Sequence, residues 1–219
     1  KRQGFFKITE GESSGLWSVL RSSEDEVLKG SLLITLYENL RWKTISPQGF
    51  REEMLAYLPN ESNSLLFSMA LSYLGDCQRI FPSDSRPLEQ VLWKIVTTNP
   101  VSQHRLQAFR LYRSIADSEE AVQRLYTLWQ ERKAPKDCTL SESDYIGLSY
   151  MLAMHLPEKA DKIIATQLSR IQNPDRKKEY QFISPSVSPR KAERDSVFAS
   201  LLIAGNRRVE PWTSSALAN

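Results

Sequence analysis

The stretch that decides the fold lies near the C-terminus, where residues 190–217 read RKAERDSVFASLLIAGNRRVEPWTSSAL. Within it, Val197, Leu201 and Ala204 recur at helical spacing. Phe198 and Leu202 lie beside them, so the pattern predicts a helix with one apolar face.

The residues after this helix predict a helix end and a second short helix. Gly205 and Asn206 are residue types that commonly end a helix in the left-handed conformation. A short helix is expected to start near Val209 and to contain Trp212. We expect Trp212 to be a buried anchor that fixes how the last helices pack.

The same stretch carries a longer pattern of residue types and spacings. It reads Arg194-x3-Phe198-x2-Leu201-x2-Ala204-x-Asn206-Arg207-x2-Glu210-x-Trp212-x3-Ala216-Leu217. This pattern resembles the C-terminal helical domain of zinc aminopeptidases of the aminopeptidase N type, in their bacterial, Bacteroides-like branch. A weaker similarity, in helix order and length and in SEDEVLKG at 23–30, extends over most of the chain.

The resemblance implies a non-catalytic role for this chain. Members of the family carry a zinc-binding His-Glu-x-x-His and a Gly-x-Met-Glu-Asn in an upstream catalytic domain, and neither motif occurs here. The complete enzyme is expected to remove N-terminal residues from peptides with a zinc-activated water and a glutamate base. This domain would cover the active site and shape the peptide chamber. Its implied partners are the upstream catalytic domain and peptide substrates, and zinc is implied only for the parent enzyme.

Composition narrows the classes of partner. There are 29 Lys and Arg against 26 Asp and Glu, a net charge of +3, and this mixed surface does not favour nucleic acid. No apolar run approaches the ~20 residues of a membrane span. Two cysteines predict no disulfide framework, and the compartment stays open between cytoplasm and periplasm.

The first 22 residues differ from the rest. The segment from Gly4 to Ile8 is aromatic and extended in character, and Gly11, Ser13, Ser14 and Gly15 are typical of a turn. We expect residues 1–22 to be a strand and loop left from a preceding β-domain. Residues 23–219 would form the C-terminal helical domain.

The remainder predicts an all-α fold built as a HEAT- or armadillo-like array of antiparallel helix pairs, an α-superhelix. Alternate helices are expected to start at Ser23, Asn60, Asn99 and Thr139, at steps of 37, 39 and 40 residues. These steps approach the ~40–47 residues of HEAT and armadillo units. Between Asn173 and Pro189 the prolines predict a connecting loop.

No residue of this chain is a convincing catalytic group or metal ligand. His104 and His155, the only histidines, do not form a His-Glu-x-x-His pair. Among the basic residues near the C-terminus we expect Arg194 and Arg207 to bind a carboxylate of the substrate, because a guanidinium matches carboxylate geometry. The alternative is a solvated, ion-paired surface. Structural roles are expected for Phe198, Asn206, Glu210 and Trp212.

Two other functions are compatible with the sequence. A free-standing HEAT-like scaffold that binds a protein or peptide is the main alternative. A parent reading frame that continues upstream through His-Glu-x-x-His would distinguish the peptidase domain from such a scaffold. RNA binding by helical repeats is a weaker alternative, because no repeated residue code is visible.

Overall fold

The computed structural model describes residues 6–218, and this part of the chain is all-α. It contains twelve α-helices and four short 3-10 turns, with no β-strand in the described residues. The chain forms two compact units, which are residues 1–116 with 136–138, and residues 117–135 with 139–219. No helix in the described part is long and apolar enough to span a membrane. The expected all-α class is confirmed.

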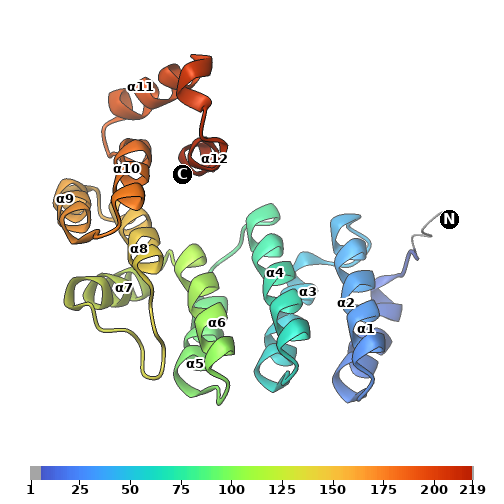
Figure 1. Cartoon of the computed structure of the whole chain (residues 1–219). Coiled ribbons are helices and arrows are strands. Elements are labelled where there is room, and N and C mark those ends of the chain that lie inside the picture. The colour runs from blue at the N-terminus through green and yellow to red at the C-terminus, as the bar shows by residue number, and fades with distance from the viewer. Residues whose placement is uncertain (1–5, 219) are drawn as a thin grey trace. The chain divides into compact units, whose positions relative to one another are not determined.

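The first unit contains the helices α1 to α6 (Figure 1). Their bounds are α1 Glu10–Ser22, α2 Glu26–Arg41, α3 Pro47–Tyr57, α4 Ser64–Ile80, α5 Arg86–Thr98 and α6 Ser102–Ile115, with the turn η1 at Leu58–Asn60. Helix α2 packs against α1, α3 and α4, while α4 also packs against α3 and α6, and α5 packs against α6. Helices α2, α4 and α6 therefore contact one another in succession.

Large apolar side chains hold these helices together. Trp17 of α1 meets Phe50 of α3 edge to face, with ring centroids 5.6 Å apart. Phe67, Phe109 and Tyr112 are completely buried. Each fully buried side chain of this size contributes about 1.5–3 kcal/mol relative to its exposed state. The core therefore runs through α1, α3, α4 and α6.

The loop predicted around Gly11 and Gly15 is wrong, because these residues lie in α1. Thr9 and Glu12 form a capping box at its start, and Trp17 is buried on the inner side. Capping and burial offset the ~1 kcal/mol that each helical glycine costs. That residues 1–22 belong to a preceding β-domain stays a prediction.

The expected strand from Gly4 to Ile8 lies partly outside the described residues. Residues 6–9 are neither helix nor strand. The segment is held by the completely buried Asn39 of α2, which accepts a hydrogen bond from Ile8 N at 2.9 Å and donates one to Phe6 O at 2.8 Å. The Asn39 side-chain amide thus provides hydrogen-bond partners for backbone groups of this segment, as a neighbouring strand would do in a sheet.

The second unit contains α7 to α12 (Figure 1). Their bounds are α7 Glu119–Glu131, α8 Glu142–His155, α9 Ala160–Arg170, α10 Pro174–Ile183, α11 Lys191–Leu201 and α12 Glu210–Ala218, with turns η2 Pro157–Lys159, η3 Ser184–Val187 and η4 Ala204–Arg207. Helix α8 packs against α7, α9 and η3, and α10 packs against α9 and α12.

The connecting loop predicted between Asn173 and Pro189 is also wrong. Asn173 accepts hydrogen bonds from the N–H groups of Asp175 and Arg176, and Pro174 occupies the first turn of α10. A proline at that position begins a helix, because the N–H it lacks has no partner there. Burial of Tyr180 then anchors α10 to the unit.

The four predicted starts of alternate helices and one helix end are corrected. The N-cap of α4 is Asn63 rather than Asn60, and that of α6 is Val101 rather than Asn99. The N-cap of α2 is Asp25 rather than Ser23. The capping box of α8 joins Ser141 to Asp144 rather than starting at Thr139. Helix α11 ends at Leu201, and no described glycine has positive φ, so a left-handed end at Gly205 is wrong. Capping by any of several closely spaced Ser, Thr or Asp residues is physically similar, so the choice depends on packing. The short helix expected near Val209 is confirmed as α12.

Candidate functional site

Arg194 lies on α11 beside a cavity of about 330 Å³ in the second unit. The cavity is lined also by Met154 of α8 and by Ser186 to Pro189. Arg194 Nη1 donates a hydrogen bond to the carbonyl oxygen of Ser188 at 2.6 Å, which directs the guanidinium toward the cavity wall. Four further N–H donors belong to this guanidinium. The position is compatible with a carboxylate partner, and the expected substrate contact stays a prediction.

Arg207 lies on the turn η4 and is exposed. It is not among the residues that line the Arg194 cavity. The structure therefore does not bring the two predicted arginines together at that cavity.

The four motif residues with expected structural roles differ in burial. Asn206 Nδ2 donates to the carbonyl oxygen of Ser200 at 2.9 Å, which ties η4 to α11. Glu210 is the first residue of α12, where a carboxylate interacts favourably with the positive end of the helix dipole. Trp212 is half-buried, and its ring centroid lies 5.9 Å from that of Phe182 of α10. The expectation that Trp212 is a buried anchor is therefore wrong in its burial. The aromatic contact still joins α12 to α10.

Phe198 belongs to a group of apolar side chains that are exposed at the end of the second unit. Its exposed fraction is 62%, and Leu202 and Ile203 are 71% and 62% exposed. We call the group the C-terminal apolar surface, and it consists of Phe198, Leu202, Ile203, Val209 and Leu217. The expected apolar face of α11 therefore points largely to solvent, apart from the buried Leu201.

Two basic residues at the start of α11 are paired with carboxylates. Arg190 binds Asp161 through two hydrogen bonds of 2.8 and 2.9 Å and also contacts Glu193. Lys191 pairs with Asp195 at 2.6 Å. These residues fit the ion-paired alternative, and at their exposure each pair contributes little to stability.

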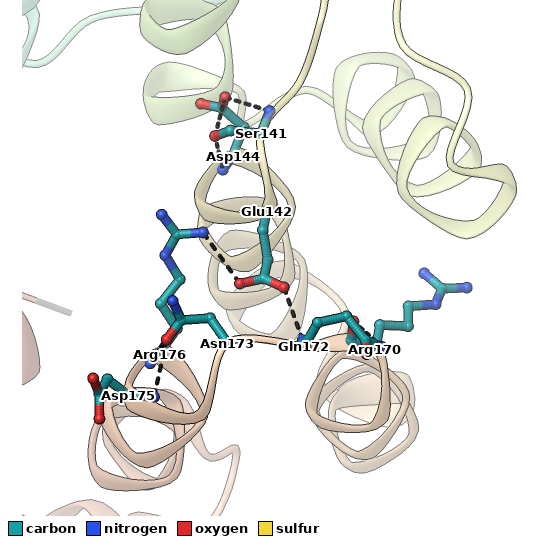
Figure 2. A network of polar contacts seen from close by, with 8 residues as sticks. All are labelled: Ser141, Glu142, Asp144, Arg170, Gln172, Asn173, Asp175 and Arg176. Atoms are coloured by element: carbon teal, nitrogen blue, oxygen red, sulfur yellow. Dashed lines mark hydrogen bonds and ion pairs between the residues drawn. The ribbon is translucent and has the colours of Figure 1, made fainter.

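Glu142 connects three segments of the second unit (Figure 2). Its carboxylate accepts the backbone N–H of Gln172 at 2.9 Å and Nη1 of Arg176 at 3.2 Å. These donors, the backbone N–H of Gln172 first, lower the pKa of Glu142. The contacts join the start of α8 to the turn between α9 and α10, so this network is structural.

A groove in the first unit was not anticipated from the sequence. It lies along α4 and α6, with a cavity volume of about 610 Å³. Leu71 and Leu111 contribute apolar wall, and Gly75 lies where a Cβ would meet Leu111 Cδ1 at 2.9 Å. Glycine therefore permits the two helices to approach closely. We call this feature the α4/α6 groove.

Polar groups occupy the walls of the α4/α6 groove. Asp76 accepts hydrogen bonds from Arg79 Nη2 at 2.6 Å and from the hydroxyl of Tyr37 at 2.8 Å. The hydrogen bond from Arg79 is the main reason why the pKa of Asp76 lies below its usual value. The Gln107 side-chain oxygen is buried without a hydrogen-bond partner in the described structure. A ligand donor could satisfy this oxygen.

The two histidines lie in different units. His104 is completely buried and stacks on Phe67 with ring centroids 4.0 Å apart, and its Nε2 lies 3.0 Å from Ser64 Oγ. His155 belongs to the other unit, where it lies 3.8 Å from Asp117. Within residues 6–218, no three His, Cys, Asp or Glu side chains are grouped to hold a metal.

No protein-family model, curated protein or solved structure matches this chain.

Proposed function

We propose that this chain is the non-catalytic C-terminal domain of a zinc aminopeptidase, which covers the active site of an upstream catalytic domain and shapes the peptide chamber. Two features support the proposal, namely the pattern from Arg194 to Leu217 and the C-terminal apolar surface. The apolar surface carries the argument, because it offers an interface at the same helices that bear the pattern. Zinc, when bound by the upstream domain, would activate the attacking water there.

Exposed apolar side chains favour burial against a partner. About 25 cal/mol is gained per Å² of apolar surface removed from water. Five large apolar side chains occur within α11, η4, α12 and their connections, with exposed fractions from 43% to 71%. We assign this surface to contact with the upstream domain of the same polypeptide.

The finer architecture is part of this proposal. Helices α2, α4 and α6 contact one another in succession, and each also packs against the helix that precedes it in the chain, respectively α1, α3 and α5. Helices α2, α4, α6 and α8 begin at Glu26, Ser64, Ser102 and Glu142. The steps of 38, 38 and 40 residues between these starts lie just below the ~40–47 of HEAT units. These contacts support an array of antiparallel helix pairs.

The docking proposal can be tested in the complete parent protein. Phe198→Ser with Leu202→Ser should weaken the contact with the catalytic domain, and therefore increase proteolytic cutting between the domains and lower kcat/KM for an aminoacyl anilide. The matched control is Val27→Ser, at an 80% exposed position on α2. Unchanged proteolysis and activity in the double variant would overturn the proposal, as would a parent reading frame without His-Glu-x-x-His.

A free-standing scaffold that binds peptides is the second candidate. The observation that favours it is the α4/α6 groove, whose volume of about 610 Å³ lies in the range of ligand pockets. A parent reading frame that encodes no peptidase domain, together with peptide binding by this chain alone, would favour the scaffold.

A further inference from the structure

We propose that the Arg194 cavity binds a small carboxylate that carries an apolar tail. The carboxylate pairs with the Arg194 guanidinium, and the tail lies between α8 and the turn η3. A free short-chain acid and the last residue of a peptide with an apolar side chain share this chemistry. The cavity lies wholly within the second unit, so the inference needs neither an upstream domain nor the C-terminal apolar surface.

Arg194 is a cation without an ionic partner in the described part of the chain. Its neighbours on α11, Glu193 and Asp195, pair instead with Arg190 and Lys191. Within residues 6–218 the Arg194 guanidinium forms one hydrogen bond, to a backbone carbonyl oxygen, and no ion pair. A guanidinium in this state gains from a carboxylate that comes from outside the chain.

The backbone hydrogen bond holds this guanidinium at the edge of the cavity. Arg194 Nη1 donates to Ser188 O at 2.6 Å, and both residues line the cavity. This bond uses one of the five N–H donors of the side chain and leaves a pair of parallel N–H groups for the two oxygens of a carboxylate. Because the side chain is already held in place, less conformational freedom is lost when a ligand binds.

Most of the remaining wall of the cavity is apolar. Ala153 and Val187 are buried and belong to one cluster of apolar core residues. Met154 of α8 is exposed, and its unbranched side chain adapts to the shape of an apolar group. Pro157 and Pro189 complete the apolar lining. An apolar tail that enters this space is removed from water, which favours binding.

The charge of the lining favours an anion. Among the described residues that line the cavity, Arg194 is the one that carries a charge. The other polar side chains there are two serine hydroxyls with partners in the chain. Ser186 donates to Ile183 O at 2.8 Å, and Ser188 Oγ accepts the backbone N–H of Arg190 at 3.2 Å. No carboxylate in this lining repels an acid, so an acid is favoured over a neutral molecule of the same shape.

The volume of the cavity, about 330 Å³, limits the size of the ligand. One water molecule takes about 30 Å³ in the liquid, so this space corresponds to roughly ten non-hydrogen atoms. A single guanidinium and a short apolar wall make a weak site, with a Kd on the order of 1 mM. The branched acid 4-methylpentanoate fits these limits and serves as the probe.

The test is a titration of the ¹⁵N-labelled 219-residue chain followed by NMR. 4-Methylpentanoate should shift the amide signals of Met154, Val187 and Arg194. 4-Methylpentanamide has the same tail without the charge, and acetate has the charge without the tail. Each should bind at least about fivefold more weakly than 4-methylpentanoate, because each lacks one of the two contacts. High salt should reduce the preference for the acid over the amide.

Two dipeptides distinguish the sources of the carboxylate. Acetyl-Ala-Leu ends in a free carboxylate beside an apolar side chain, and acetyl-Ala-Leu-amide lacks that charge. The acid should again bind more tightly than the amide. The tighter ligand of acetyl-Ala-Leu and 4-methylpentanoate identifies whether a peptide end or a free acid fits the cavity better.

Variants of exposed residues locate the binding. Arg194→Gln should weaken 4-methylpentanoate to the level of its amide, and Arg194→Lys, which retains the charge, should restore part of the affinity. Met154→Ser should weaken 4-methylpentanoate several-fold and leave acetate unchanged. Lys191→Gln, on the same helix in an ion pair with Asp195, is the matched control and should leave binding unchanged. The Tm of each variant is measured alongside.

Four results would overturn the inference: no shift at the cavity residues, equal affinity for 4-methylpentanoate and its amide, equal affinity for 4-methylpentanoate and acetate, or equal weakening by Arg194→Gln and Lys191→Gln. The last would mean that the overall charge of the chain attracts the acid. None of these results bears on proteolysis or activity of the parent protein with Phe198→Ser and Leu202→Ser, so the inference and the docking proposal can fail separately.

Discussion

Trp129 of α7 donates its indole N–H to the side-chain oxygen of Gln167 of α9 across 2.8 Å, and both residues are buried, with 3% and 2% exposed. Arg170 strengthens the same connection, because its guanidinium lies 4.8 Å from the Trp129 ring and donates to Trp129 O at 3.0 Å. Two residues of α9 thus hold the C-terminal end of α7.

Removal of the Gln167 acceptor should destabilise the second unit. Gln167→Leu leaves the buried indole N–H unpaired, so the free energy of unfolding should fall by about 1–3 kcal/mol. Urea unfolding monitored by circular dichroism measures this change. Gln130→Leu, at an exposed position on the same helix α7, is the matched control and should change stability by less than about 0.5 kcal/mol. Equal effects of the two variants would contradict the assigned role of the buried bond.

Glu142 should stabilise the chain only while it is ionised. Its lowered pKa means that the folded state holds the carboxylate proton less tightly than the unfolded state. The stabilisation is therefore complete above the unfolded pKa of about 4.3 and is lost as pH falls through the folded pKa. Glu142→Gln should cost roughly 1 kcal/mol at pH 7 and almost nothing near pH 2.5.

The Glu142 prediction is checked by urea unfolding at a series of pH values. Glu24→Gln, at an exposed position before α2, is the control for the change of residue type. A penalty for Glu142→Gln that stays constant down to pH 2.5 would assign the effect to packing instead of charge.

His104 should make the first unit less stable in mild acid. Burial, the main cause, lowers the pKa of His104, while the nearby charge of Glu61 acts in the opposite direction. The unfolded state therefore binds a proton at a pH where the folded state does not. Stability is complete above the unfolded pKa of about 6.5 and is lost as pH falls toward the folded pKa.

His104→Phe retains an aromatic ring against Phe67 and removes the titrating group. Its free energy of unfolding should vary less between pH 8 and pH 5.5 than that of the unaltered chain. Chemical denaturation at four pH values tests this expectation, with His155→Asn as the control that retains His104. An identical pH slope in His104→Phe and the unaltered chain would show that other groups cause the dependence.

Trp212 should contribute less to stability than a fully buried tryptophan. It is half-buried, and the centroids of its ring and the Phe182 ring are 5.9 Å apart. Trp212→Ala should therefore lower the free energy of unfolding by about 1–2 kcal/mol, less than the 3–5 kcal/mol typical of core aromatic deletions. Thermal unfolding of the two proteins measures the loss, with Trp42→Ala, at a 67% exposed position, as the comparison. A loss above about 3 kcal/mol would indicate a more closed packing of α12 on α10 than the structure shows.

Arg194 and Arg207 should contribute to substrate binding in the complete enzyme. Each Arg→Gln change should lower kcat/KM more for short peptides with a free C-terminal carboxylate than for their C-terminal amides. The extra loss on the acids should correspond to about 1.5–3 kcal/mol of transition-state binding free energy. Kinetics on paired acid and amide substrates measure the difference. Arg194→Gln also loses the hydrogen bond to Ser188 O, so its Tm is measured alongside. Equal losses on both substrates would assign the arginines to a structural role.

The sequence by itself determined the elements whose signals are local. Apolar residues at helical spacing predicted the all-α class, and the short helix expected near Val209 is α12. Helical periodicity and capping depend on neighbours within about four residues, so they are readable without the fold. The absence of a zinc motif is likewise a property of the sequence.

Only the tertiary structure decided the features that join distant residues. Asn39 pairs with the segment at Phe6 and Ile8, and Tyr180 meets Ser149, which no local pattern specifies. The burial of Trp17 made α1 a helix despite its glycines. The α4/α6 groove required the close approach of Gly75 and Leu111. Packing between elements sets burial, and burial determines which polar groups are left without partners.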